Sequence, residues 1–74
     1  MTRLPVLSGQ ELVTLLRRLG YEVDRQTGSH IVLRNSKPPH RRLTVPNHRT
    51  IAKGTLRAIL RHAGIQVDEL LREN

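Results

Sequence analysis

The sequence contains no cysteine, no phenylalanine and no tryptophan, and Tyr21 is its single aromatic residue. Without cysteine the chain has neither disulfides nor a thiolate zinc site, and it carries no direct redox sign of its compartment. Without large aromatic rings the core has to consist of Leu, Ile and Val. There is no run of about 18 apolar residues and no signal-peptide pattern, so we expect a soluble, cytoplasmic protein.

The length of the chain limits it to one folding unit. Seventy-four residues lie below the usual size of a domain, so we expect a single domain over residues 1–74 with one small core. A core of this size supplies at most about 3–5 kcal/mol of stability.

Acidic residues are also scarce, with 6 Asp and Glu against 13 Lys and Arg. The formal net charge is +7, and 11 of the 13 cations are Arg. Arg makes bidentate contacts with phosphate and stacks on bases, whereas a surface that only needs solubility can use Lys equally well. The composition therefore indicates a polyanionic partner.

The first third of the chain predicts a helix followed by a strand. Residues 8–11 (Ser-Gly-Gln-Glu) fit a capping box, apolar residues follow at helical spacing, and Gly20 supplies a left-handed stop. We therefore expect a helix over residues 9–19. After Gly20 the period changes to two, which predicts a strand over residues 21–26 with its odd-numbered residues on one face, and then a turn at Thr27-Gly28.

The rest of the chain predicts two more strands and two more helices. Strands are expected over residues 29–34 and 41–45, because the two prolines between them cannot donate to a sheet. A second helix should end at Gly64, and a short third helix should cover residues 67–72. The fold class is thus α+β, in the order α-β-β-β-α-(α), with a three-stranded antiparallel sheet and the helices packed on one face.

Alternation along the second strand separates buried from open positions. If Ile31 and Leu33 face the helices, His30 lies on the opposite face or at its edge. In the last helix, either Leu70 or Leu71 should pack against the core.

Several segments resemble the HicA family of small toxins, and together they cover the chain from about Ser8 to Leu71. These segments are Ser-Gly-x-Glu-Leu at 8–12, Leu-Gly-Tyr at 19–21, Gly-Ser-His at 28–30, Leu-Thr-Val-Pro-Asn-His at 43–48, and Lys-Gly-Thr-Leu-Arg-Ala-Ile-Leu-Arg-His-Ala-Gly-Ile at 53–65.

The resemblance to HicA implies a fold similar to a double-stranded-RNA-binding domain. It also implies metal-independent cleavage of mRNA and a HicB-type antitoxin partner, usually encoded beside the toxin. The catalytic histidine of the family follows Gly-Ser, and here that position is His30, with Gly28 and Ser29 as candidate supporting residues.

Metal-free RNA cleavage matches the chemistry of histidine and arginine. The 2′-OH of the substrate attacks the adjacent phosphorus, so the enzyme has to move protons and stabilise an anionic phosphorane. Imidazole gains or loses a proton near neutral pH, which suits His30 to act as general base or acid. Cations and N–H donors aimed at the developing charge supply the stabilisation. The competing interpretation is that His30 is an exposed strand residue that hydrogen-bonds locally.

A metal site is the other interpretation of the histidines. The spacings between His30, His40, His48 and His62 run from 8 to 14 residues, which does not match the close pairs of zinc motifs. We therefore expect no metal and no other cofactor.

Seven cations are predicted to contact RNA. They include a stripe with a spacing of four on the second helix, where related folds contact phosphates, and we expect replacement of Arg57 and Arg61 by Gln to weaken binding. The set is Lys37, Arg41, Arg42, Arg49, Lys53, Arg57 and Arg61. An acidic antitoxin surface is expected to cover the same arginines and Val32 while it blocks His30.

Two other functions fit the same composition. A non-catalytic RNA-binding module would use the same basic face, and only the Gly-Ser-His segment favours the enzyme over it. A ribosome- or scaffold-associated basic protein would need long basic tails, and the segments 1–7 and 72–74 are too short for that role.

Overall fold

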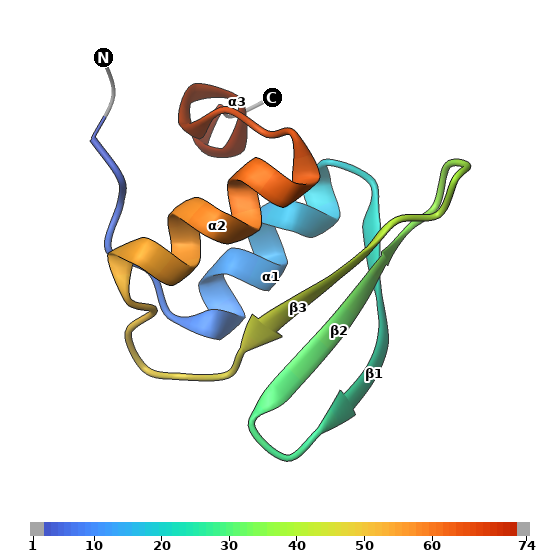
Figure 1. Ribbon diagram of the computed structural model, residues 1–74, viewed down its shortest axis with the longest axis horizontal. Coiled ribbons are helices and arrows are strands. Elements are labelled where there is room, and N and C mark those ends of the chain that lie inside the picture. Colours follow the sequence, from blue (N-terminus) through green and yellow to red (C-terminus); the bar gives the residue numbers. More distant parts are fainter. Residues whose placement is uncertain (1–2, 73–74) are drawn as a thin grey trace.

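A computed structural model describes residues 3–72 and contains the predicted elements in the predicted order (Figure 1). The elements are α1 (Gly9–Arg18), β1 (Tyr21–Thr27), β2 (His30–Asn35), β3 (Arg42–Pro46), α2 (Lys53–Ala63) and α3 (Val67–Leu71). The prediction of an α+β fold with a three-stranded antiparallel sheet is confirmed.

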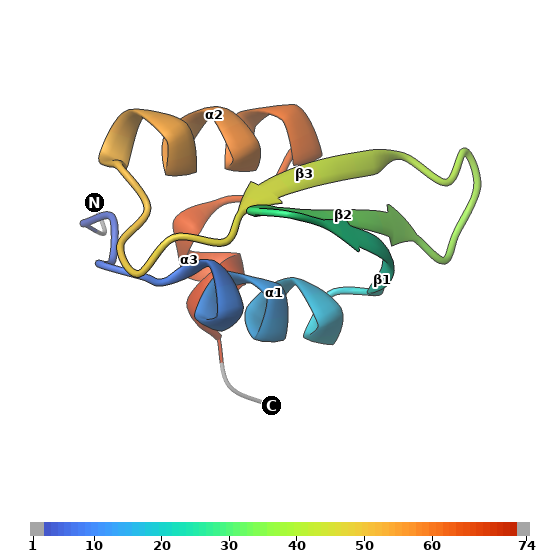
Figure 2. The same cartoon turned by 90° about the horizontal axis from the view of Figure 1, so that it is seen from below.

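The three strands pair in the order β1-β2-β3, and both pairs are antiparallel. Burial alternates along β2 and β3, with Ile31, Leu33, Leu43 and Val45 buried. The helices cover this face, α1 mainly against β1 and α2 against β3 (Figures 1 and 2). The opposite face of the sheet is open, as the alternation predicts.

The helix ends follow the sequence signals closely. The Ser8 hydroxyl accepts a hydrogen bond from the Glu11 N–H (3.1 Å), and the Glu11 carboxylate accepts one from the Ser8 N–H (2.9 Å), so the capping box is confirmed. Helix α2 ends at Gly64, whose φ of 72° is left-handed, a conformation that glycine adopts without steric cost. Helix α1 ends one residue earlier than predicted, with Leu19 as its C-cap.

The first hairpin differs from its prediction in two ways. Its turn is Gly28-Ser29 and not Thr27-Gly28, because Thr27 is still paired with His30. The pairing register also shifts at Asp24, between the pairs Val23–Leu33 and Arg25–Val32. Such a bulge exchanges the two faces beyond it. The prediction that Arg25 shares a face with Val23 is therefore wrong, and Arg25 lies on the open face with Val32.

The core is aliphatic apart from Tyr21, and it contains residues from every helix and strand. Leu70 is 2% exposed and Leu71 is 37% exposed, so Leu70 is the leucine with which α3 packs on the core. None of the helices in residues 3–72 has the length and apolar composition needed to cross a membrane.

Candidate functional site

His30 is the first residue of β2, and its side chain is exposed. It pairs with Thr27 on one side and Pro46 on the other. The preceding turn contains Gly28 with a φ of 55°, a left-handed value that a residue with a Cβ adopts only with strain. The tight turn and the alternation with buried Ile31 together place His30 at one end of the open face.

Three chain segments meet at this end of the sheet. The Asn47 N–H donates to the Ser29 carbonyl (2.6 Å), and the Gln10 side-chain amide donates to the Asn47 side-chain oxygen (3.1 Å). The Gly9 N–H donates to the His48 carbonyl (2.9 Å). The start of α1 is thus tied to residues 46–48, and these residues are tied to the turn that precedes His30.

This junction requires glycine at position 9. A Cβ on Gly9 would lie 2.3 Å from the Pro46 carbonyl oxygen and 2.9 Å from the Asn47 Cα. Both are backbone atoms, which cannot rotate away as a flexible side chain can. Gly9 therefore allows α1 to pack directly on the segment beside His30.

Arginines lie on the open face beyond the histidine. The register places Arg25 beside Val32 and Thr44, in the row next to that of His30. The following row contains Glu22, Arg34 and Arg42, and successive rows are about 6.6 Å apart at the usual rise per strand residue. Three arginines thus share this uncovered face with the histidine, and the nearest of them, Arg25, lies one row away.

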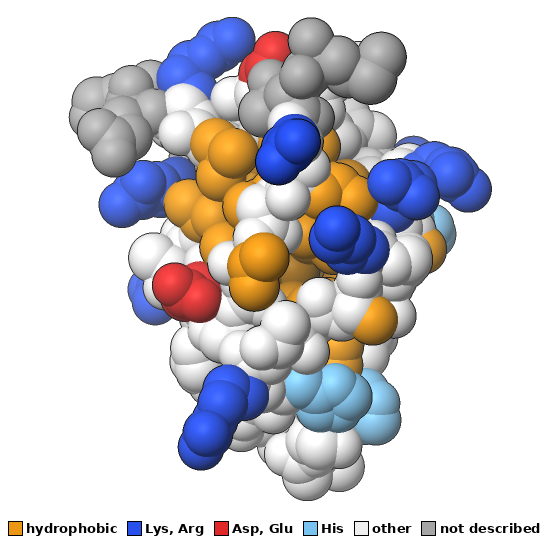
Figure 3. Space-filling view, turned by 90° about the vertical axis from the view of Figure 1, so that its left-hand side faces the viewer, with side chains coloured by type: hydrophobic (Ala, Val, Ile, Leu, Met, Phe, Trp, Pro, Cys, Tyr) orange, Lys and Arg blue, Asp and Glu red, His pale blue; other side chains and the backbone are white. Residues whose placement is uncertain are grey.

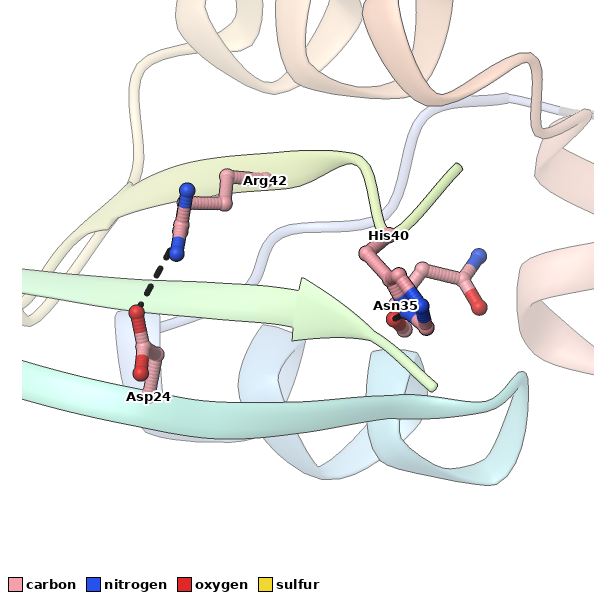
Figure 4. Close-up of polar contacts among 4 residues, drawn as sticks. All are labelled: Asp24, Asn35, His40 and Arg42. Atoms are coloured by element: carbon pink, nitrogen blue, oxygen red, sulfur yellow. Dashed lines mark hydrogen bonds and ion pairs between the residues drawn. The ribbon is translucent and has the colours of Figure 1, made fainter. Parts of the chain in front are cut away.

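One of these arginines is held by an ion pair. The Arg42 Nε lies 3.3 Å from the Asp24 Oδ2, and the pair spans β2 from β3 to β1 (Figure 4). The two side chains are 63% and 38% exposed, so the pair adds only about 0–1 kcal/mol to stability. Its main effect is to direct the Arg42 guanidinium along the open face.

The loop between β2 and β3 lies at the far end of the sheet. His40 has a left-handed φ of 59°, and its Nδ1 lies 3.1 Å from the Asn35 carbonyl oxygen (Figure 4). The Arg41 guanidinium donates to the His62 carbonyl (3.1 Å) in the last turn of α2. Arg41 thus connects the loop to α2 and satisfies a helix-terminal carbonyl.

The seven cations that the sequence groups together do not form one surface. Arg42 lies on the open face, and the exposed Arg49 follows β3 near the end that holds His30. Lys37 and Arg41 belong to the far loop. The three remaining cations, on α2, line a groove on the helix layer: Lys53, Arg57 and Arg61.

Two arginines of the open face are absent from the predicted set. Arg34 was recognisable, since strict alternation from Ile31 and Leu33 places it on the same face as His30. Arg25 was not, because the bulge at Asp24 that turns it to this face has no sequence signal in the chain. Gln10 and Asn47 were also missed as residues that organise this end of the sheet.

The histidines do not converge on a metal-binding cluster. Within residues 3–72, no three His, Asp or Glu side chains are grouped as ligands for an ion. His30 and His40 lie near opposite ends of β2, and His62 lies on α2. His48 is exposed, two residues after the Pro46 that pairs with His30.

Comparison with known proteins agrees with the fold and the motifs. A family model described as the HicA toxin of bacterial toxin-antitoxin systems matches residues 9–65 of the 74-residue chain. The match runs from the start of α1 to the residue after Gly64, and it includes His30. No curated protein matches the sequence.

Proposed function

Because the chain belongs to the HicA family of toxins from bacterial toxin–antitoxin systems, we propose that it is an endoribonuclease that cleaves mRNA without a metal and so inhibits translation. His30 is its catalytic histidine. The observation that carries this proposal is the placement of His30. It is the exposed histidine at the end of an open, arginine-bearing sheet face, in the part of the chain that matches the family.

The reaction requires two proton transfers around one phosphorus atom. The 2′-oxygen forms a bond to phosphorus while the His30 imidazole takes its proton. The bond from phosphorus to the 5′-oxygen then breaks, and that oxygen leaves with a proton from a second acid or from water. The products are a 2′,3′-cyclic phosphate and a 5′-hydroxyl end. A positioned general base of this kind contributes typically about 10²–10⁴-fold to the rate.

The surroundings of His30 supply the charge that this reaction needs. A phosphorane carries more negative charge than the phosphodiester, and fixed cations or N–H donors lower its energy. Arg25 lies one row from His30 on the open face, and Arg49 lies in the segment after β3. Gly28 and Ser29 form the turn directly before His30, so their backbone and the Ser29 hydroxyl are the nearest donors along the chain.

The antitoxin of such a system has to silence this face. We propose a HicB-type antitoxin that covers the open face, blocks His30 and pairs acidic side chains with the arginines. Val32 is only half-buried there, and a partner would complete its burial. An interface of standard size takes about 800 Å² from each partner, and the chain exposes 5352 Å² in all. Because RNA and the antitoxin would use the same open face, their binding should exclude one another.

Cleavage of a long single-stranded RNA in excess EDTA tests the proposal. The parent chain, His30→Ala and His62→Ala are compared, with folding checked by circular dichroism. His62 is exposed on α2, so it controls for the loss of a histidine elsewhere. We expect the parent and His62→Ala to leave 5′-hydroxyl ends, and His30→Ala to be slower by about 100-fold or more.

Two results would change the conclusion. Equal cleavage by His30→Ala and the parent would remove His30 from the mechanism. If no variant cleaves but all bind RNA with a steep salt dependence, the chain is a non-catalytic RNA-binding module.

A further inference from the structure

A second basic surface lies on the helix layer, away from the open face. It is a groove of about 980 Å³ between the N-terminal segment, α2 and the connection from α2 to α3. Its apolar part includes Val6, Leu60 and Ile65. Val6 is 74% exposed and Ile65 is partly buried, whereas Leu60 is 4% exposed, so Val6 and Ile65 supply accessible apolar surface in the groove. Figure 3 shows hydrophobic side chains gathered in a hollow with Lys and Arg side chains around it.

The charged residues that line this groove are all cations. Four of the described residues that line it are cations, and none is Asp or Glu: Arg3, Lys53, Arg57 and Arg61. The last three recur every four residues along α2, so they are about 6 Å apart along the helix axis. An apolar floor beside a regular row of cations is the complement of an amphipathic helix that carries carboxylates at the same spacing.

RNA is a poor match for this combination. Phosphates would pair with the cations but would leave the aliphatic floor exposed or cover it with a polar backbone. Single-stranded RNA uses aromatic side chains to stack its bases, and the one aromatic residue, Tyr21, is 4% exposed in the core. Apolar side chains of a protein partner, in contrast, gain free energy by burial on such a floor.

A second copy of the chain does not fit either. A two-fold interface would place the same four cations of each copy close together, and each copy carries a net charge of +7. The occupant therefore has to be both apolar and acidic.

We propose that this groove binds an acidic amphipathic helix of a partner protein, with its apolar side on Val6 and Ile65 and its carboxylates along Arg57 and Arg61. The identification of that partner with the antitoxin rests on the proposed function. In that case the antitoxin holds the toxin at two places, and only the contact with the open face blocks RNA. The groove contact adds affinity without touching His30.

A charge-exchange experiment with synthetic helices tests the groove. The probe is a peptide of about 15 residues, long enough to be partly helical alone, with one leucine stripe flanked by glutamates. Its twin has lysine at every glutamate. Both are titrated into the parent chain, into Arg57→Glu/Arg61→Glu, and into Arg17→Glu/Arg18→Glu, which makes the same charge change on α1 outside the groove.

We expect the parent and the α1 variant to bind the acidic peptide at least tenfold more tightly than the lysine twin. The groove variant should reverse that preference, and the reversal itself shows that the variant is folded. The proposal is overturned if the parent does not prefer the acidic peptide, or if both variants lose that preference equally.

Two activity measurements separate this proposal from the ribonuclease proposal. In a His30→Ala background, RNA binding by the groove variant is compared with that of the α1 variant, because the sequence predicts that Arg57 and Arg61 contact RNA. A selective loss of RNA binding in the groove variant would assign the cations of α2 to RNA instead. Normal peptide selectivity in a chain that cleaves no RNA would leave the groove assignment standing and refute only the proposed function.

Discussion

Replacement of Gly9 by alanine should destabilise the protein and impair its site together. The added Cβ would lie 2.3 Å from the Pro46 carbonyl oxygen, so α1 and residues 46–48 have to separate. Overpacking of this kind costs about 1–3 kcal/mol. Loss of the hydrogen bond from the Gly9 N–H to the His48 carbonyl costs about 1 kcal/mol more. The better helix propensity of alanine returns at most about 1 kcal/mol.

The net loss of about 1–3 kcal/mol is a large part of the roughly 3–5 kcal/mol that a core of this size provides. Urea unfolding followed by circular dichroism measures it, and we expect the midpoint to fall by about 1–2 M at the usual slope for small proteins. Cleavage should also fall under conditions where the variant is folded, because residues 46–48 adjoin His30.

Gly54→Ala is the matched control. Gly54 lies in α2, and apart from the adjoining residues and backbone of that helix, no atom of residues 3–72 lies within 4 Å of the position that its Cβ would take. Alanine there should therefore raise the free energy of unfolding by up to about 1 kcal/mol. If Gly9→Ala unfolds at the same urea concentration as the parent, the close contact between α1 and residues 46–48 does not constrain the protein, and our reasoning about this end of the sheet fails.

Three further predictions address the core and the open face. Leu70→Ala should lower the free energy of unfolding by about 2–5 kcal/mol, and Leu71→Ala should lower it by less than about 0.5 kcal/mol, both measured by urea unfolding. Equal losses would contradict the observation that Leu70 is the buried one of the two leucines. Asp24→Asn should change the free energy of unfolding by less than about 1 kcal/mol. It should nevertheless tighten RNA binding at low salt, because it frees Arg42 and removes a negative charge. Weaker binding would show that the ion pair positions Arg42 for RNA. Replacement of Arg25 and Arg34 by Gln should reduce the slope of log affinity against log salt by about 1.4, or about 0.7 for each lost phosphate contact with a single strand. An unchanged slope would remove the open face from the RNA model. The control for net charge is Arg17→Gln/Arg18→Gln, which makes the same charge change on α1.

The sequence was sufficient to predict the helices and strands, because the residues that specify each of them lie close together in the chain. The capping box at Ser8 and the left-handed stop at Gly64 depend on residues within one helical turn. The alternation of β2 depends only on its own side chains, so it placed His30 on the open face before any packing was known. The Gly-Ser-His segment is likewise local, and it is one of the ordered segments on which the resemblance to HicA depends.

The bulge at Asp24 and the place of Arg25 depended on the tertiary structure. A bulge is a property of two paired strands, so the sequence of β1 alone could not show where its faces exchange. The need for glycine at position 9 arises from residues 46–48, which are distant in the chain. The contact of the Arg41 guanidinium with the carbonyl of His62 likewise joins residues that are 21 positions apart in the chain.

The sequence by itself determined that the chain is a small, strongly basic α+β domain with an exposed histidine after a glycine turn, because composition, capping and periodicity are local properties. Only the tertiary structure decided how the cations are divided. Sheet register gathers Arg25, Arg34 and Arg42 on the open face, while helix packing places Lys53, Arg57 and Arg61 beside an apolar groove. Charge counts cannot separate these two surfaces, since the division depends on which side of the sheet each element packs.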